Sequence, residues 1–199
     1  MKKLLMMTTI AATLAAFAQE VPVPAPVAPG LAAAPLAETA TGGLCKTYNG
    51  EFHSDVGEFE TSLSKAIAID QGYDAAATKF NGEAIAKHSY NAVSWEGFLK
   101  SPEAGAFTFT ISPSERPYMA PGAYVIKING KEFKGNTQQT VTTELRKGLN
   151  SIFIATAIVE SHPITIDYRY NASTKPSVPL MPKNIKHIVG DDDKQVVFE

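Results

Sequence analysis

The feature that most constrains the fold is a set of short segments in which apolar and polar residues alternate. They read FTFTI from Phe107, AYVIKIN from Ala123, QTVTTELRKG from Gln139 and PITIDYRY from Pro163. A two-residue period puts every second side chain on one face, as in a half-buried β-strand. The expected apolar faces are Phe107, Phe109 and Ile111; Tyr124, Ile126 and Ile128; Val141, Thr143 and Leu145; and Ile164, Ile166, Tyr168 and Tyr170.

The segments between and beside these strands complete a fold-class prediction. Asn129-Gly130 tolerates the positive φ angles of a tight hairpin turn. The segment LNSIFIATAIV from Leu149 is apolar on both faces, which is typical of a central strand. Strands at this spacing predict an all-β protein, an antiparallel β-sandwich of jelly-roll type with at most one or two short helices. The alanine-rich part of residues 60–80 places one such helix near residues 73–79.

The N-terminal stretch has two lysines, an apolar core and small residues around Ala18. This pattern predicts a secretory signal peptide over residues 1–18, followed by a Pro/Ala-rich linker over 19–42. An uncleaved membrane anchor is the alternative, but the apolar run is shorter than the roughly 20 residues that span a bilayer. We expect a sandwich domain over 43–189, an acidic tail over 190–199, and export to the periplasm, cell surface or medium of a bacterium.

Charge and cysteine content limit the partners. The formal net charge is −2 and no cluster of lysine and arginine runs along the chain, so nucleic acid is not an expected partner. Cys45 is the single cysteine of a chain with an export signal. It is interpreted as a buried thiol in a strand, with an intermolecular disulfide as the alternative.

A family resemblance emerges from the order of several motifs. They are GLCKTYNGEF from Gly43, ETSLSKAIAID, VSWEGFLKSPEAGAFTFTI, YVIKINGK, ELRKGLNSIFI and ITIDYRYN. In this order they resemble the protective-antigen (PA-fourteen) type β-sandwich domain over residues 43–182. Within that pattern Trp95 is expected to fill the space between two sheets, and Gly97 and Gly105 to allow a close backbone approach or a turn.

The resemblance implies a binding module, with one departure. Carbohydrate-binding members of the family usually carry adjacent aspartates in the loop after the Phe-Thr-Phe strand, where they hold calcium. Here that loop reads SPSERPYMAPGAY and contains Glu115 and Arg116 but no aspartate. Calcium takes six to eight oxygen ligands, so no metal site is expected in this loop. No other cofactor is expected. The candidate binding residues are Glu115, Arg116 and Tyr118, which offer directional polar contacts on a proline-restricted loop.

The residues give little support for an enzyme. His53, His88, His162 and His187 are scattered, without the spacing of a zinc or nucleophilic site. The acidic cluster GEFHSDVGEFE from Gly50 is interpreted as a solvated face, not as a glycosidase pair, and the three aspartates of GDDDK as a solvated tail.

The sequence therefore predicts an exported, non-catalytic recognition module, with glycan as the favoured ligand and no calcium. The alternative is a structural or assembly subunit of a cell-envelope or surface complex, whose partner would be a protein. The C-terminal KQVVFE could add to such a partner's sheet edge.

Overall fold

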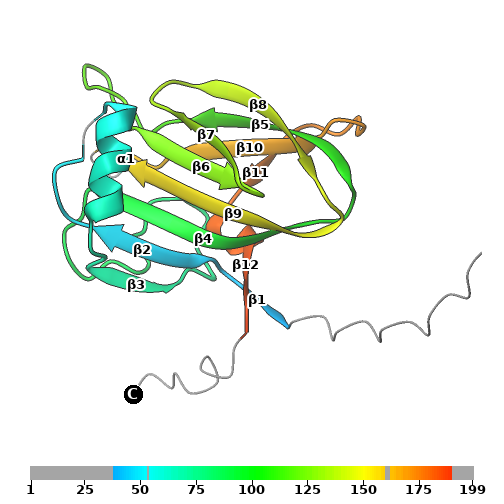
Figure 1. Ribbon diagram of the computed structural model, residues 1–199, viewed down its shortest axis with the longest axis horizontal. Coiled ribbons are helices and arrows are strands. Elements are labelled where there is room, and N and C mark those ends of the chain that lie inside the picture. The colour runs from blue at the N-terminus through cyan, green and yellow to red at the C-terminus, as the bar shows by residue number, and fades with distance from the viewer. Residues whose placement is uncertain (1–37, 53, 160–161, 190–199) are drawn as a thin grey trace, which may run out of the picture. The chain divides into compact units, whose positions relative to one another are not determined.

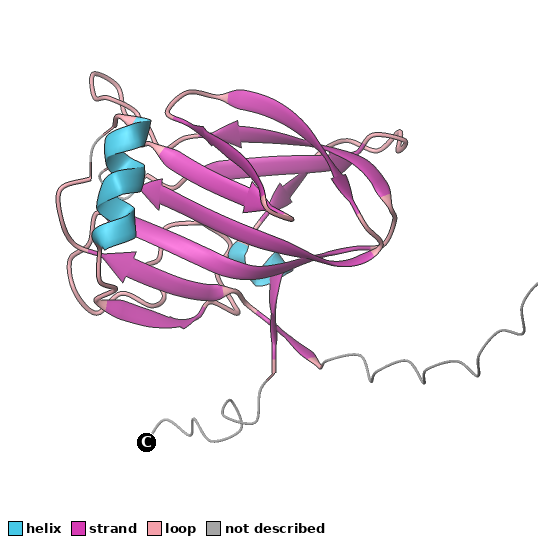
Figure 2. Cartoon of the chain, in the orientation of Figure 1, coloured by secondary structure: helices cyan, strands magenta, loops and turns pink. Residues whose placement is uncertain are grey.

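The computed structural model describes residues 38–52, 54–159 and 162–189. The predicted signal peptide, most of the predicted linker, His53 and the acidic tail lie outside the described residues. The described chain forms two antiparallel sheets, and the all-β prediction is confirmed (Figure 1, Figure 2).

The two sheets differ in size. The larger contains β1 (Thr39–Thr41), β2 (Leu44–Tyr48), β3 (Asp70–Tyr73), β4 (Ala92–Ser101), β6 (Tyr124–Ile128), β7 (Lys131–Gly135), β9 (Gly148–Ala157) and β12 (Ile185–Ile188). The smaller contains β5 (Gly105–Ser112), β8 (Gln139–Leu145), β10 (Thr165–Tyr170) and β11 (Val178–Leu180), in the order β11-β10-β5-β8. The folded part thus includes β1, which begins four residues before Gly43.

Strand β4 organises the larger sheet. One of its edges pairs along its full length with β9, which continues to β6 and β7. Its other edge pairs first with β2 and then with β12. Gly97 lies at the changeover, where an added Cβ would meet the carbonyl oxygen of Lys186 at 2.5 Å. The close approach predicted for Gly97 is therefore present, and it lets two strands share one edge.

The core lies between the sheets and contains the predicted apolar faces. Phe107, Phe109 and Ile111 of β5 are buried opposite Tyr124, Ile126 and Ile128 of β6. Trp95 is fully buried in the same cluster, as expected for a residue that fills the space between two sheets. The turn after β6 has positive φ at both Asn129 and Gly130, which confirms the predicted hairpin.

The helix prediction was wrong in position. The helix α1 spans Val56–Lys65, and residues 74–79 are not helical. Asp55 caps α1 by accepting the N–H of Glu58 at 3.0 Å, and Phe59 is buried beneath the helix on the outer face of the larger sheet. Alanine content favoured the later segment, but packing decides where a short helix forms. A second, single-turn helix, η1, spans Pro182–Asn184.

Cys45 is a buried free thiol in β2, as interpreted from sequence. Burial and the nearby Asp74 both raise its pKa. A thiol that is covered and held neutral is a poor nucleophile, which argues against the intermolecular disulfide. No helix among the described residues is long and apolar enough to cross a membrane.

Candidate functional site

The loop between β5 and β6 has a firmly anchored base. Ser114 is buried, and its hydroxyl donates to the carbonyl of His162 and accepts the N–H of Val159 at 3.2 Å. The N–H of Gly122 donates to the carbonyl of Ser114 at 2.6 Å and closes the loop. Position 122 requires glycine because the backbone of Ala157 passes close to it, and an added Cβ would lie 2.5 Å from the carbonyl oxygen of Ala157.

The tip of this loop contains the three predicted binding residues. Glu115, Arg116 and Tyr118 are all exposed and lie within one turn, where the N–H of Met119 donates to the carbonyl of Arg116 at 3.2 Å. Tyr118 is fully exposed and has a φ of 68°, in the left-handed region. That conformation is uncommon for a bulky side chain and costs on the order of 1 kcal/mol or more. Such strain at an exposed aromatic ring is a reason to suspect function.

Sequence reasoning missed the residues that hold this loop. Ser114 and Gly122 were part of the quoted segment but were not singled out, and no local pattern marks them. The partner of the Ser114 hydroxyl is 48 residues away in the chain. Met119 was also missed; it is half-exposed beside Tyr118 and adds an apolar surface to the tip.

The loop offers little to a metal ion. Its one carboxylate is that of Glu115, and within the described ranges no three His, Cys, Asp or Glu side chains come together as a metal site would require. Two carboxylates of the acidic cluster around α1 have structural roles. Asp55 caps the helix, and Glu60 forms a 2.8 Å ion pair with Lys134 of β7.

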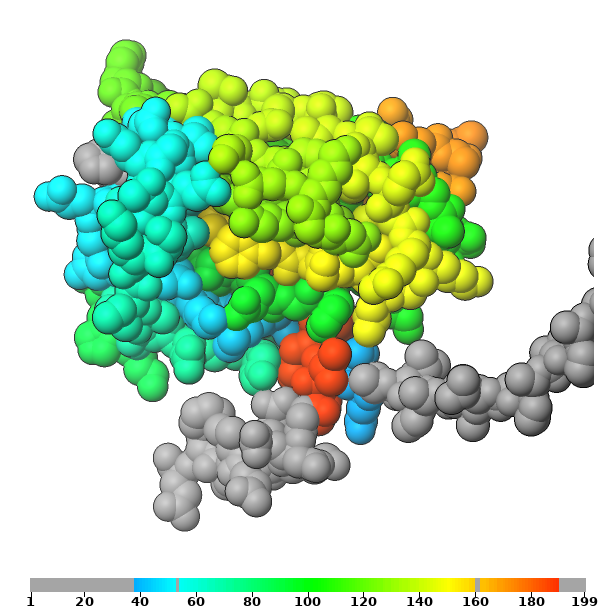
Figure 3. Space-filling model, in the orientation of Figure 1, coloured from blue at the N-terminus to red at the C-terminus, as the bar shows by residue number. Residues whose placement is uncertain are grey.

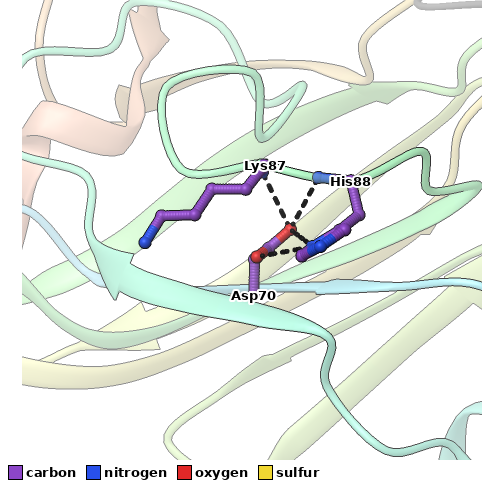
Figure 4. Close-up of polar contacts among 3 residues, drawn as sticks. All are labelled: Asp70, Lys87 and His88. Carbon is purple, nitrogen blue, oxygen red and sulfur yellow. Dashed lines mark hydrogen bonds and ion pairs between the residues drawn. The ribbon is translucent and has the colours of Figure 1, made fainter.

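One carboxylate and imidazole pair resembles the Asp–His part of a catalytic triad. The carboxylate of Asp70 in β3 lies 3.1 Å from the ring nitrogen Nδ1 of His88, and it accepts hydrogen bonds from the backbone N–H groups of Lys87 and His88 at 2.8 and 3.1 Å (Figure 4). Two of these three groups are backbone amides, so the carboxylate anchors the segment from 74 to 91 to the sheet. Desolvation alone would raise the pKa of Asp70, but these hydrogen bonds and the His88 charge lower it overall.

A second carboxylate holds the other end of that segment. Asp74 is almost fully buried, and it accepts the indole N–H of Trp95 at 3.3 Å while its Oδ1 has no hydrogen-bond partner. Burial raises the pKa of Asp74, and the Trp95 indole and the Ala77 amide only partly oppose this. The pKa values of the two aspartates are therefore shifted in opposite directions, and so their contributions to folding stability change in opposite directions with pH.

We expect Asp74→Asn to gain stability relative to the parent as pH rises from below the ordinary aspartate pKa of ~3.9 to neutrality. A raised folded-state pKa means that the parent loses stability as Asp74 ionises, whereas the amide does not titrate. Asp70→Asn is the matched control with the opposite slope, because a lowered pKa gives the parent stability that is complete above the unfolded-state pKa and is lost as pH falls through the folded-state pKa. Urea unfolding across this pH range measures both. Parallel pH profiles for the two variants would contradict the assignment.

No family model matches the chain, and no curated protein matches it. Solved structures do. The PA14 domain of the MpAFP antifreeze protein matches with a TM-score of 0.54 at 10% identity, covering 79% of this chain and 96% of that domain. The epithelial adhesin 9 A domain from Candida glabrata, solved in complex with Galβ1-4GlcNAc, matches with a TM-score of 0.54 at 11% identity, covering 84% and 96%.

An anti-sigma factor domain-containing protein from Clostridium clariflavum also matches, with a TM-score of 0.50 at 11% identity. The match covers 82% of this chain but 53% of that one, so this chain spans about half of that protein. At these identities the likeness concerns the fold. The chain has the PA14 β-sandwich fold that its motifs resemble.

Proposed function

We propose that this protein is an exported, non-catalytic recognition module that binds glycan through the β5–β6 loop without calcium. The observation that carries the proposal is the combination of an anchored loop base and a strained, fully exposed Tyr118 at the tip. A loop held in this way presents its side chains with little further loss of conformational entropy on binding. The sugar-bound adhesin domain of the same fold supports the ligand class.

The tip has the chemistry that a sugar requires. The Tyr118 ring offers an apolar face for C–H groups, the Arg116 guanidinium offers several donors, and the Glu115 carboxylate accepts from hydroxyls. Charge-assisted hydrogen bonds of this kind are stronger than neutral ones. Export agrees with the predicted signal peptide and with the adhesin identity of the sugar-bound neighbour.

A protein partner is the second candidate, in keeping with a subunit of an envelope or surface assembly. Met119 favours it, because a flexible, half-exposed thioether beside Tyr118 suits a protein pocket better than a sugar. The calcium-free glycan proposal and this alternative differ in what the loop captures.

A glycan array probed with and without chelator tests the proposal. We expect binding to at least one glycan, with the same intensity under both conditions, because the loop has a single carboxylate. Added calcium should leave the melting temperature unchanged, since an ion that binds only the folded state would raise it. A chelator-sensitive signal would refute the calcium-free mechanism. An empty array beside a specific capture from envelope extract would favour the assembly subunit.

A further inference from the structure

The outer face of the larger sheet is covered over only part of its area by the described residues. The helix α1 packs over one part through Phe59, which contacts a cluster that includes Tyr48, Val125 and Ala155. Beside the helix lies an open groove of about 440 Å³, lined by residues of β2, β3, β4, β6, β9 and β12. Figure 3 views this face, with the cyan helix over its left part and green β4, yellow β9 and red β12 to the right of it.

Five side chains lie in one row across this groove, which we call the transverse row. Tyr73 is opposite Leu44, Leu44 is opposite Glu96, Glu96 is opposite Phe153, and Phe153 is opposite Lys127. Directly opposed residues share a face of the sheet, so the row crosses β3, β2, β4, β9 and β6 in order. With strands about 4.8 Å apart, it spans ~19 Å.

The aromatic members of the row are held in place. The Tyr73 ring is half-exposed and stacks on the His187 ring, with centroids 3.8 Å apart and planes within 15°. Phe153 is half-buried because it also packs against the cluster beneath α1. Phe98, on the next row of β4, adds a third half-buried ring to the lining. Rings fixed in this way need little ordering when a ligand arrives.

The charged members stand on either side of the Phe153 ring. Lys46 donates to the Glu96 carboxylate at 2.6 Å, and this hydrogen bond is the main reason that the pKa of Lys46 is raised. Lys127 lies 3.1 Å from the Glu132 carboxylate. The Glu96 and Lys127 side chains keep 44% and 46% of their surface exposed, so both can still meet a ligand. One acceptor and one donor are thus oriented across a ring.

We propose that this groove binds an oligosaccharide whose chain runs across the strands. Pyranose rings with equatorial hydroxyls have flat C–H faces for the aromatic rings, and rim hydroxyls for Glu96 and Lys127. The strand repeat of about 4.8 Å is close to the length of one such sugar unit, so successive units meet successive members of the row. A peptide is less suited to this face, because the backbone N–H and C=O groups of central strands such as β4 and β9 are already paired.

The groove differs from the β5–β6 loop in its strands and in its residues, and the proposal does not rest on the loop's function. Cellohexaose and chitohexaose are suitable probes, because both are linear chains of equatorially substituted rings. Titration calorimetry and amide chemical shifts on the full chain should show binding of at least one of them. Tyr73→Ala and Glu96→Gln should each weaken it about tenfold, the usual cost of losing a charge-assisted or stacking contact.

Two control variants lie on the outer face of the smaller sheet, and the first of them matches Glu96→Gln. Glu144→Gln removes an exposed carboxylate of β8, and Thr142→Ala trims an exposed neighbour; neither should change the affinity. Circular dichroism melts check that all four variants fold. The proposal is overturned if neither hexaose binds at millimolar concentration, or if binding survives both Tyr73→Ala and Glu96→Gln. Binding that disappears only when the tip of the β5–β6 loop is exchanged would assign the sugar to the loop and also overturn the groove.

Discussion

Replacing Trp95 with alanine should lower the free energy of unfolding by about 3–5 kcal/mol, the usual cost of truncating a buried aromatic residue. The indole is fully buried and packs edge-on against Phe80, with centroids 4.9 Å apart. Its loss also leaves the buried Asp74 carboxylate without its side-chain donor. Urea unfolding followed by circular dichroism measures the change.

Trp95→Phe separates packing from hydrogen bonding, because it retains a ring but removes the indole N–H. We expect an intermediate loss of stability that grows with pH, since ionised Asp74 then lacks the indole donor. Tyr73→Ala, at a half-exposed aromatic residue of the same sheet, is the control for ring loss at the surface. If Trp95→Ala unfolded like the parent, the core assignment of this residue would be wrong.

Exchanging the tip of the β5–β6 loop should abolish recognition by the loop and leave the sandwich folded. The change replaces the residues from Glu115 to Pro121 with Asn-Gly and retains Ser114 and Gly122. In the parent, the Gly122 N–H already donates to the Ser114 carbonyl, which is the hydrogen bond that a two-residue turn would close. The Ser114 hydroxyl keeps its partners, so the anchor survives.

Glycan-array binding and the melting temperature are the two measurements for this exchange. The point variant Tyr118→Ala should reproduce much of the binding loss without shortening the loop. Its melting temperature should stay close to the parent value, because the side chain is fully exposed. A loop-exchanged protein that stays folded and binds its glycan at full strength would show that the loop has no role in recognition.

The strands could be predicted from the sequence because the residues that mark a strand and its turn are close neighbours in the chain. Alternation of two residues placed Phe107, Phe109 and Ile111 on the buried face, and the Asn129-Gly130 pair set the turn. The position of α1 could not be found in the same way. Its ten residues are a short helix that depends on burial of Phe59 against the sheet, a long-range contact. The alanine-rich segment near residues 73–79, where the helix was predicted, is not helical and is instead connected to the core by the hydrogen bond between Asp74 and Trp95.

The candidate sites differ in the same way: the loop could be predicted from local sequence, whereas its anchor and the transverse row depend on long-range contacts. Proline and polar residues identified the β5–β6 loop as exposed, and the structure places all three predicted residues at its tip. The anchor at Ser114 depends on partners far along the chain. The transverse row was beyond reach for the same reason: its members come from five strands, and only the pairing register makes neighbours of Tyr73 and Leu44 or of Phe153 and Lys127.

The pairing of β1 with β12 predicts how the domain should respond to a mechanical load. The two strands are antiparallel, with Thr39 opposite Ile188 and Thr41 opposite Lys186. A force that separates the flanking chain at residues 38 and 189 would act first on the hydrogen bond between Glu38 and Val189, and then on each pair in turn. The strands would open like a zipper instead of shearing together. Strand β12 pairs with β1 near its end and with β4 near its start. A stretched domain could therefore lose the β1–β12 pairing while the pairing of β4 with β9 and the core behind them stay intact.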